Sequence, residues 1–191
     1  CLALIERWHG KGRLRYSITP RFAPTSTPEQ LALAGELYKS RPDLHVQSHL
    51  AENPAEIAWV GQLFPNCRDY LDVYRHYGLL GPRTIYGHCI HLAPVEIGEM
   101  ASTGSAAAFC PTSNLFLGSG FFNHAAASEA GIRVGLATDV GGGTSFSLIR
   151  TLGEAYKVSQ VHRRPLPPLR AWFLATLGGA QALYLDEIGR A

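Results

Sequence analysis

Short apolar segments alternate along the chain with longer segments in which apolar residues recur at helical spacing. Two of the short segments, residues 105–110 and 132–138, are almost entirely small or apolar, which is typical of strands buried on both faces of a parallel sheet. The pattern predicts strands at residues 13–19, 44–49, 84–88, 105–110 and 132–138.

Helix starts are predicted from capping residues as well as from periodicity. Thr27 precedes Pro28, and Gln30 stands at the capping-box position. Asn53 before Pro54 gives a second start. Further helices are predicted at residues 69–77, 93–103, 121–130, 145–161 and 169–183.

Repeated strand–helix units imply an α/β fold with a parallel sheet, and both a doubly wound sheet and a barrel fit this pattern. A complete (β/α)₈ barrel typically needs about 250 residues, whereas this chain has 191. The chain begins with Cys1 rather than Met and stops soon after a helix-like segment. We therefore expect it to be a fragment of a larger protein.

Composition disfavours several classes of protein. A net charge of +2 argues against a nucleic-acid or membrane-surface role, and no apolar run is long enough to span a membrane. No GxGxxG sequence follows an early strand, which disfavours a Rossmann-like nucleotide binder. The four cysteines form no CxxC pair. Without a secretory signal, we expect reduced thiols and a cytoplasmic location.

Polar residues follow the predicted strands, at the end where parallel α/β folds place active sites. Arg21 follows the first strand, His49 and His88 end the second and third, and Asp139 follows the fifth. Imidazole and carboxylate groups serve metal binding and proton transfer. Arg21 and Phe22 pair a planar donor with an aromatic face, which suits a flat heterocycle. We predict that these side chains share one rim around a divalent cation.

Each of these residues also has a structural interpretation. Glu52, three residues after His49, can reach over the predicted site or can simply cap a helix. His88 could be a core histidine bonded to the backbone, and Asp139 could cap a turn. His91 is expected on the surface at a helix entry.

Four segments, in order along the chain, closely resemble guanine deaminases of the amidohydrolase superfamily, which are metal-dependent (β/α)₈ barrels. They are residues 19–25 (TPRFAPT), 47–53 (QSHLAEN), 110–115 (CPTSNL) and 137–143 (ATDVGGG). The first two are rather specific to the guanine branch. The resemblance implies that residues 1–191 form a single partial TIM-like barrel domain with about five parallel βα units.

The resemblance also implies zinc-dependent deamination of guanine to xanthine and ammonia in purine catabolism. Zinc would lower the pKa of its water, and hydroxide would attack C2 while a glutamate moves protons to N3 and to the leaving amine. A homodimer is implied as well. The implied residues are His49 and Asp139 for zinc, Glu52 and His88 for catalysis, and Arg21, Phe22 and His88 for substrate binding.

One feature departs from the family pattern, because the HxH pair of the first barrel strand is missing from this sequence. A catalytic zinc site normally has three or more protein ligands. We therefore expect a full-length parent to deaminate guanine and the 191-residue piece to do so weakly or not at all. The alternatives are another amidohydrolase, such as a chlorotriazine hydrolase or an adenosine-type deaminase, or a non-catalytic subunit with a disused site.

Overall fold

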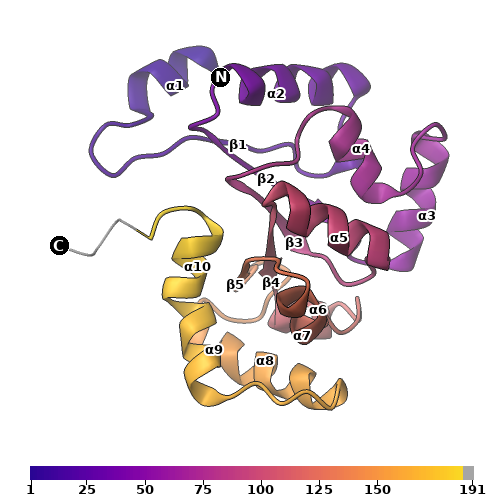
Figure 1. The fold of residues 1–191 in the computed structure, drawn as a ribbon, viewed down its shortest axis with the longest axis vertical. Coiled ribbons are helices and arrows are strands. Elements are labelled where there is room, and N and C mark those ends of the chain that lie inside the picture. The colour runs from indigo at the N-terminus through magenta and orange to yellow at the C-terminus, as the bar shows by residue number, and fades with distance from the viewer. Residues whose placement is uncertain (187–191) are drawn as a thin grey trace.

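The computed structural model describes residues 1–186 and has an α/β architecture with its strands at the centre (Figure 1). Within these residues the strands form one five-stranded sheet, in which every neighbouring pair is parallel. The strands are β1 (Ser17–Ile18), β2 (His45–Leu50), β3 (Thr84–His88), β4 (Ala106–Phe109) and β5 (Val134–Leu136).

The order of the strands distinguishes between the two folds that the sequence left open. A doubly wound sheet reverses its strand order at a switch point. Here each strand pairs with the next one along the chain, from β1 to β5, without a reversal. Since parallel crossovers are right-handed, crossovers that all step in one direction place their helices on one face of the sheet. This is the arrangement of a (β/α)₈ barrel rather than of a doubly wound sheet.

Most helices begin where the sequence predicts. Thr27 Oγ1 accepts a hydrogen bond from Gln30 N at 3.1 Å, and Asn53 Oδ1 accepts one from Glu56 N at 2.9 Å. The helices are α1 (Leu2–Trp8), α2 (Pro28–Ser40), α3 (Pro54–Leu63), α4 (Tyr70–His76), α5 (Pro94–Thr103), α6 (Pro111–Phe116), α7 (His124–Glu129), α8 (Leu148–Val161), α9 (Pro168–Ala175) and α10 (Leu177–Ala182), with a 3₁₀ turn η1 at Ala23–Thr25.

Three sequence expectations are corrected by the structure. The strand predicted at residues 13–19 is confined to β1, and Leu14 is half exposed. The helix predicted at residues 169–183 is divided into α9 and α10 at Thr176, whose φ and ψ of −131° and −104° are not helical. The short helices α1 and α6 were not predicted, and their N-cap residues, Cys1 and Cys110, make no side-chain cap from which a helix start could be read.

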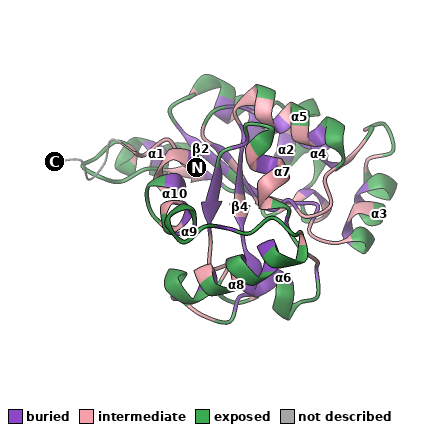
Figure 2. Cartoon of the chain, turned by 60° about the horizontal axis from the view of Figure 1, so that its bottom comes forward, coloured by how far each residue is buried: buried purple, intermediate pink, exposed green. Residues whose placement is uncertain are grey.

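The core lies between the sheet and the helices that cover it, and Figure 2 shows buried residues on the strands and exposed ones on outer helix faces. Tyr74 on α4 and Tyr86 on β3 are fully buried, with ring centroids 4.9 Å apart. The Tyr74 hydroxyl donates to the carbonyl of His49 at 2.7 Å and accepts from the amide of Ala23. This buried tyrosine therefore fixes the end of β2 relative to the loop after β1.

Among residues 1–186, no helix combines the length and the apolar character that crossing a membrane requires.

Candidate active site at the strand ends

Three potential metal ligands meet at the carboxyl ends of the strands. His49 lies near the end of β2, His88 ends β3, and Asp139 follows β5. One ligand atom from each lies within 4.8 Å of the other two. Parallel strands present their carboxyl ends at one edge, so residues far apart in sequence share this rim. The structure thus brings together the three side chains that the sequence singled out.

Hydrogen bonds orient both imidazoles toward this shared point. His49 Nδ1 lies 2.6 Å from the carbonyl of Arg21, which can only accept, so Nδ1 carries the proton. His88 Nδ1 lies 2.8 Å from Asn114 Oδ1 and is likewise placed as the donor. In the neutral rings, both Nε2 atoms are then left as acceptors or ligands. Outer partners of this kind fix the orientation of metal-binding histidines.

Two carboxylates face these imidazoles. Glu52 Oε2 lies 3.6 Å and Asp139 Oδ2 lies 3.9 Å from His88 Nε2. Within residues 1–186, neither carboxylate forms an ion pair with a lysine or an arginine. Buried or half-buried negative groups are costly without a partner. Imidazole nitrogen and carboxylate oxygen are the donors that zinc takes, so this group fits a divalent cation.

The backbone at this rim is held in a conformation that most residues avoid. Ala51, His88, Cys89 and Asp139 have φ of 49°, 68°, 52° and 45°. Left-handed backbone at non-glycine residues costs on the order of 1–3 kcal/mol each and gathers at functional sites. Cross-strand bonds hold it here, since Cys89 N donates to the carbonyl of Leu50 at 2.9 Å.

The predicted substrate residues flank the same group. Arg21 is exposed, and its guanidinium carbon lies 5.4 Å from the centre of the Phe22 ring. The Phe22 ring meets the His49 ring edge-on, with centroids 6.2 Å apart. Arg21, His49, His88 and Asp139 line a cavity of about 240 Å³. A flat ring could therefore enter beside the candidate metal ligands.

Size alone does not identify this cavity. A larger one, of about 1110 Å³, lies beside α1 and α2 and is lined by no histidine and no aspartate. We assign the site by its chemistry, since convergent polar groups mark a functional cavity better than volume does.

Cys110 also lines the smaller cavity, but its thiol is protonated at neutral pH. Burial, followed by the nearby charge of Asp139, raises the pKa of this thiol to about 12. Since the thiolate is the nucleophile, Cys110 is not suited to covalent catalysis.

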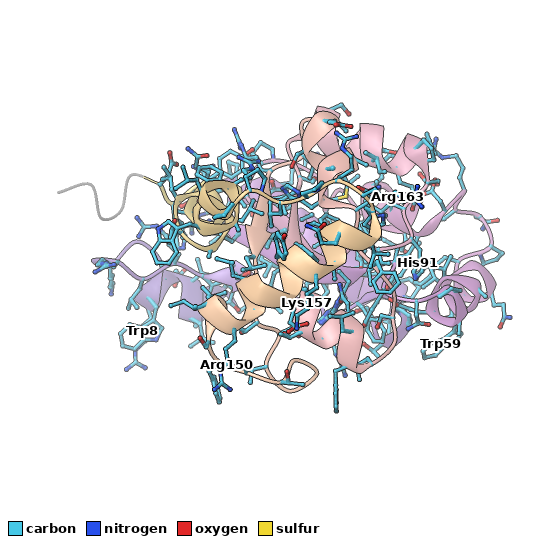
Figure 3. The ribbon with its side chains drawn as sticks, turned by 90° about the horizontal axis from the view of Figure 1, so that it is seen from below. Trp8, Trp59, His91, Arg150, Lys157 and Arg163 are labelled. Atoms are coloured by element: carbon cyan, nitrogen blue, oxygen red, sulfur yellow. The ribbon has the colours of Figure 1, made fainter. Side chains whose placement is uncertain are left out.

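Several contacts at the site were not predicted from the sequence. Asn114 is buried and bonds to His88, yet among residues 1–186 its Nδ2 has no hydrogen-bond partner, and neither has the buried Ser113 Oγ. Ser119 Oγ donates to Glu52 Oε1 at 2.9 Å. His91, which is labelled in Figure 3, was expected on the surface but is half-buried, and its Nε2 lies 2.8 Å from the carbonyl oxygen of Ser119. For Ser119, the only local signal was the pair of glycines beside it.

Comparisons with known proteins agree with this arrangement. The chain is 53% identical over 185 residues to the guanine deaminase of Escherichia coli, covering 97% of this chain and 42% of that protein. The solved structure of the E. coli enzyme matches with a TM-score of 0.96, over 97% of this chain and 43% of that one. A guanine deaminase from C. acetobutylicum, solved with bound guanine, is 32% identical with a TM-score of 0.91, over 95% of this chain and 45% of that one.

The chain therefore spans less than half the length of these relatives. Together with its strand order, the structural match identifies the sheet as part of a (β/α)₈ barrel. Residues 1–190 match the model of the amidohydrolase family. The chain belongs to the amidohydrolase family.

Proposed function

We propose that this chain is the portion of a guanine deaminase that carries its proton-transfer group, part of its metal site and part of its purine site. The observation that carries this proposal is the convergence of His49, His88 and Asp139 at one rim, with Glu52 directly beside them. Similarity to a guanine deaminase over 97% of the chain supports guanine as the substrate. The reaction consumes guanine and water and yields xanthine and ammonia.

His49, through Nε2, and Asp139 would hold the metal, for which we propose zinc. A bound zinc ion supplies Lewis acidity that lets water ionise near neutral pH. His88, whose Nε2 faces both Glu52 and Asp139, would hydrogen-bond the reacting water or the substrate. The sequence holds no HxH pair to complete the ligand set. We therefore propose that the 191-residue chain by itself binds zinc poorly and deaminates weakly or not at all.

Glu52 would carry the protons. Its Oε2 faces the site while its Oε1 is held by Ser119, so one oxygen is available to accept and return a proton. Addition of water at C2 of guanine releases a proton that Glu52 would deliver to N3. Glu52 would then take a second proton from the hydroxyl added at C2 and pass it to the exocyclic amine. The C2–N bond breaks, ammonia leaves, and C2 keeps a carbonyl oxygen. Positioned acid–base groups of this type contribute about 10²–10⁴-fold to rate.

Arg21 and Phe22 would bind the purine. The guanidinium lies over the face of Phe22, and Arg21 is exposed and lines the cavity. A flat ring bearing acceptor oxygen and nitrogen atoms suits both features. Membership of purine catabolism, a cytoplasmic location and a homodimeric parent are further parts of this proposal and stay predictions.

The test is turnover by the purified full-length parent, supplied in turn with guanine, adenosine and a chlorotriazine. We expect release of ammonia and formation of xanthine from guanine, with one zinc bound per chain. Turnover confined to either of the other compounds would identify another amidohydrolase. No turnover of any of them, with no bound zinc, would indicate a non-catalytic subunit instead.

A further inference from the structure

The proton carrier of the proposed site is held by a turn that comes from a distant part of the chain. Ser119 lies between α6 and α7, 67 positions after Glu52, and its hydroxyl donates to Glu52 Oε1 at 2.9 Å. The other carboxylate oxygen, Oε2, is 3.6 Å from His88 Nε2. The two oxygens of Glu52 therefore have different environments, one tied to a serine and one facing the site.

The turn that carries Ser119 is itself tightly fixed. Gly118 and Gly120 on either side have φ of 70° and 132°, which only glycine adopts readily. A Cβ on Gly120 would lie 3.0 Å from Ile90 and 3.3 Å from the ring of His91, so a side chain there would crowd both residues. The backbone of Ser119 is bonded at both ends, since its N–H donates to the carbonyl of Asn114 at 2.9 Å and its own carbonyl accepts from His91.

The hydrogen bond between Ser119 and Glu52 is largely shielded from water. Ser119 is 6% exposed and the Glu52 side chain is 18% exposed, so little water is available to replace the hydroxyl. A hydrogen bond to a charged acceptor is stronger than one between neutral groups. The main chain at Glu52 is fixed independently, because its N–H donates to Glu56 Oε2 at 3.2 Å. The hydroxyl of Ser119 thus contacts a carboxylate whose backbone is already held in place.

We propose that Ser119, anchored by His91, is a positioning residue that sets the orientation of Glu52 for proton transfer. The inference rests on the proposed function, because it assigns a role in that reaction. Ser119 need not touch substrate or metal. It acts through Glu52, by occupying Oε1 and directing Oε2 toward the reacting atoms.

The experiment compares Ser119→Ala with Ser119→Thr in the zinc-loaded full-length parent. Alanine should lower kcat for guanine roughly 10- to 100-fold with little change in KM, since misplacing a reacting group can cost on the order of 10²-fold. Threonine keeps the hydroxyl and should restore most of kcat. The matched control is Ser159→Ala on α8, where a serine that is 5% exposed donates its hydroxyl to the carbonyl of Ala155. It should leave kcat unchanged.

A second arm separates a positioning role from a general structural one. In a Glu52→Gln background, Ser119→Ala should cause no further loss of kcat, because the two residues act through one group. An equal loss in both backgrounds would overturn the inference, as would a Ser119→Ala enzyme that behaves like Ser159→Ala.

A crystal structure of the Ser119→Ala variant tests the placement without any turnover. We expect the Glu52 carboxylate to rotate away from His88 Nε2, and an unchanged carboxylate would overturn the inference. If the unmodified parent fails to deaminate guanine, the proposed function is wrong and so is any role of Ser119 in it. If the parent is active but the variant results go against expectation, only the inference about Ser119 fails.

Discussion

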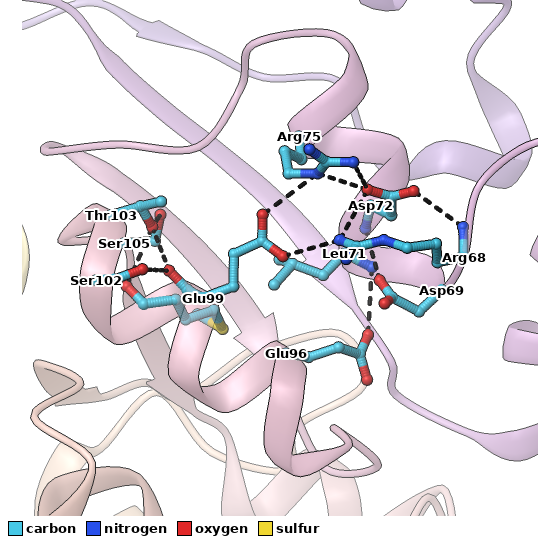
Figure 4. Close-up of polar contacts among 11 residues, drawn as sticks. Arg68, Asp69, Leu71, Asp72, Arg75, Glu96, Glu99, Ser102, Thr103 and Ser105 are labelled. Atoms are coloured by element: carbon cyan, nitrogen blue, oxygen red, sulfur yellow. Dashed lines mark hydrogen bonds and ion pairs between the residues drawn. The ribbon is translucent and has the colours of Figure 1, made fainter.

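Asp72 on α4 and Glu99 on α5 have arginine partners (Figure 4), whereas Glu52 and Asp139 at the strand ends have none among residues 1–186. Asp72 Oδ1 lies 3.1 Å from Arg68 Nη2 and is also paired with Arg75. Glu99 Oε2 lies 3.2 Å from Arg68 Nη2, and Glu99 Oε1 lies 3.4 Å from Arg75 Nε. The charges of Asp72 and Glu99 are thus balanced by two guanidinium groups of the same chain, and these four residues are called the balanced group below.

At the strand ends the balance is different. Glu52 and Asp139 lie near His88, and no lysine or arginine within residues 1–186 forms an ion pair with either. Their neighbours are imidazole nitrogens with free lone pairs, which cannot neutralise a carboxylate unless they are protonated. A cluster of acidic residues therefore does not by itself indicate a metal site. The balanced group needs no further cation, whereas Glu52 and Asp139 would be neutralised by a bound cation.

The largest expected effect is on turnover. In the zinc-loaded full-length parent, Glu52→Gln should lower kcat for guanine by about 10²–10⁴-fold, because an amide cannot carry the protons. Steady-state kinetics with metal analysis checks this, and bound zinc should be unchanged. Glu99→Gln, in the balanced group, serves as the control and should leave kcat near its original value. Turnover that survives Glu52→Gln would remove Glu52 from the mechanism.

The second expected effect is on the zinc-dependent rise in Tm, which should depend on Asp139 at the strand ends and not on Asp72 of the balanced group. Zinc should raise the Tm of the full-length parent, since a ligand at 100 times its Kd stabilises by about 2.7 kcal/mol. Asp139→Asn should abolish most of this zinc-dependent shift, because it removes a charged ligand. Asp72→Asn should leave the shift intact even if it changes the starting Tm. Equal shifts in the two variants would show that Asp139 does not bind the metal.

The sequence predicted that the strand-end side chains lie together, because parallel strands present their carboxyl ends at one edge of the sheet. His49 and His88 lie at the carboxyl ends of adjacent parallel strands, so both reach the same rim. The register places His49 opposite Gly87 and Leu50 opposite His88, and regular alternation would point the two histidines to opposite faces. The left-handed backbone of His88, with φ of 68°, breaks this alternation at the end of β3, and the two rings stack with centroids 5.3 Å apart. Capping at Thr27 is equally local and was also predicted correctly. What these successes share is that a few neighbouring residues determine the outcome.

The failures involve contacts that only the folded chain creates. Alternation at Leu14 suggested a longer first strand, but β1 finds partners only for Ser17 and Ile18. His91 looked like a surface residue because the residue it bonds to, Ser119, lies 28 positions later. Hydrogen bonds between loops leave no periodic pattern in a sequence. The contacts of Ser119 and His91 could therefore not be predicted from the sequence, although Glu52 itself was predicted as a candidate.

The smallest expected effect is on the free energy of unfolding, and it concerns Asp72 of the balanced group. Burial would raise the pKa of Asp72, but hydrogen bonds from the backbone and side chain of Arg68 and from Arg75 outweigh it and lower the pKa to about 2. A carboxyl whose pKa is depressed by folding stabilises the protein above its unfolded value of 3.8 and loses that contribution as the pH falls toward 2.

Asp72→Asn should therefore cost roughly 1 kcal/mol at neutral pH, a modest value because both arginine partners are about half exposed and solvent screens them. Urea unfolding of the full-length parent and the variant, from about pH 6 down to about pH 3, measures the difference. The gap should narrow steadily as acid protonates Asp72. A gap that stays constant with pH would mean that asparagine loses packing or backbone bonds rather than charge, and the two acidic groups would then differ less than their partners suggest.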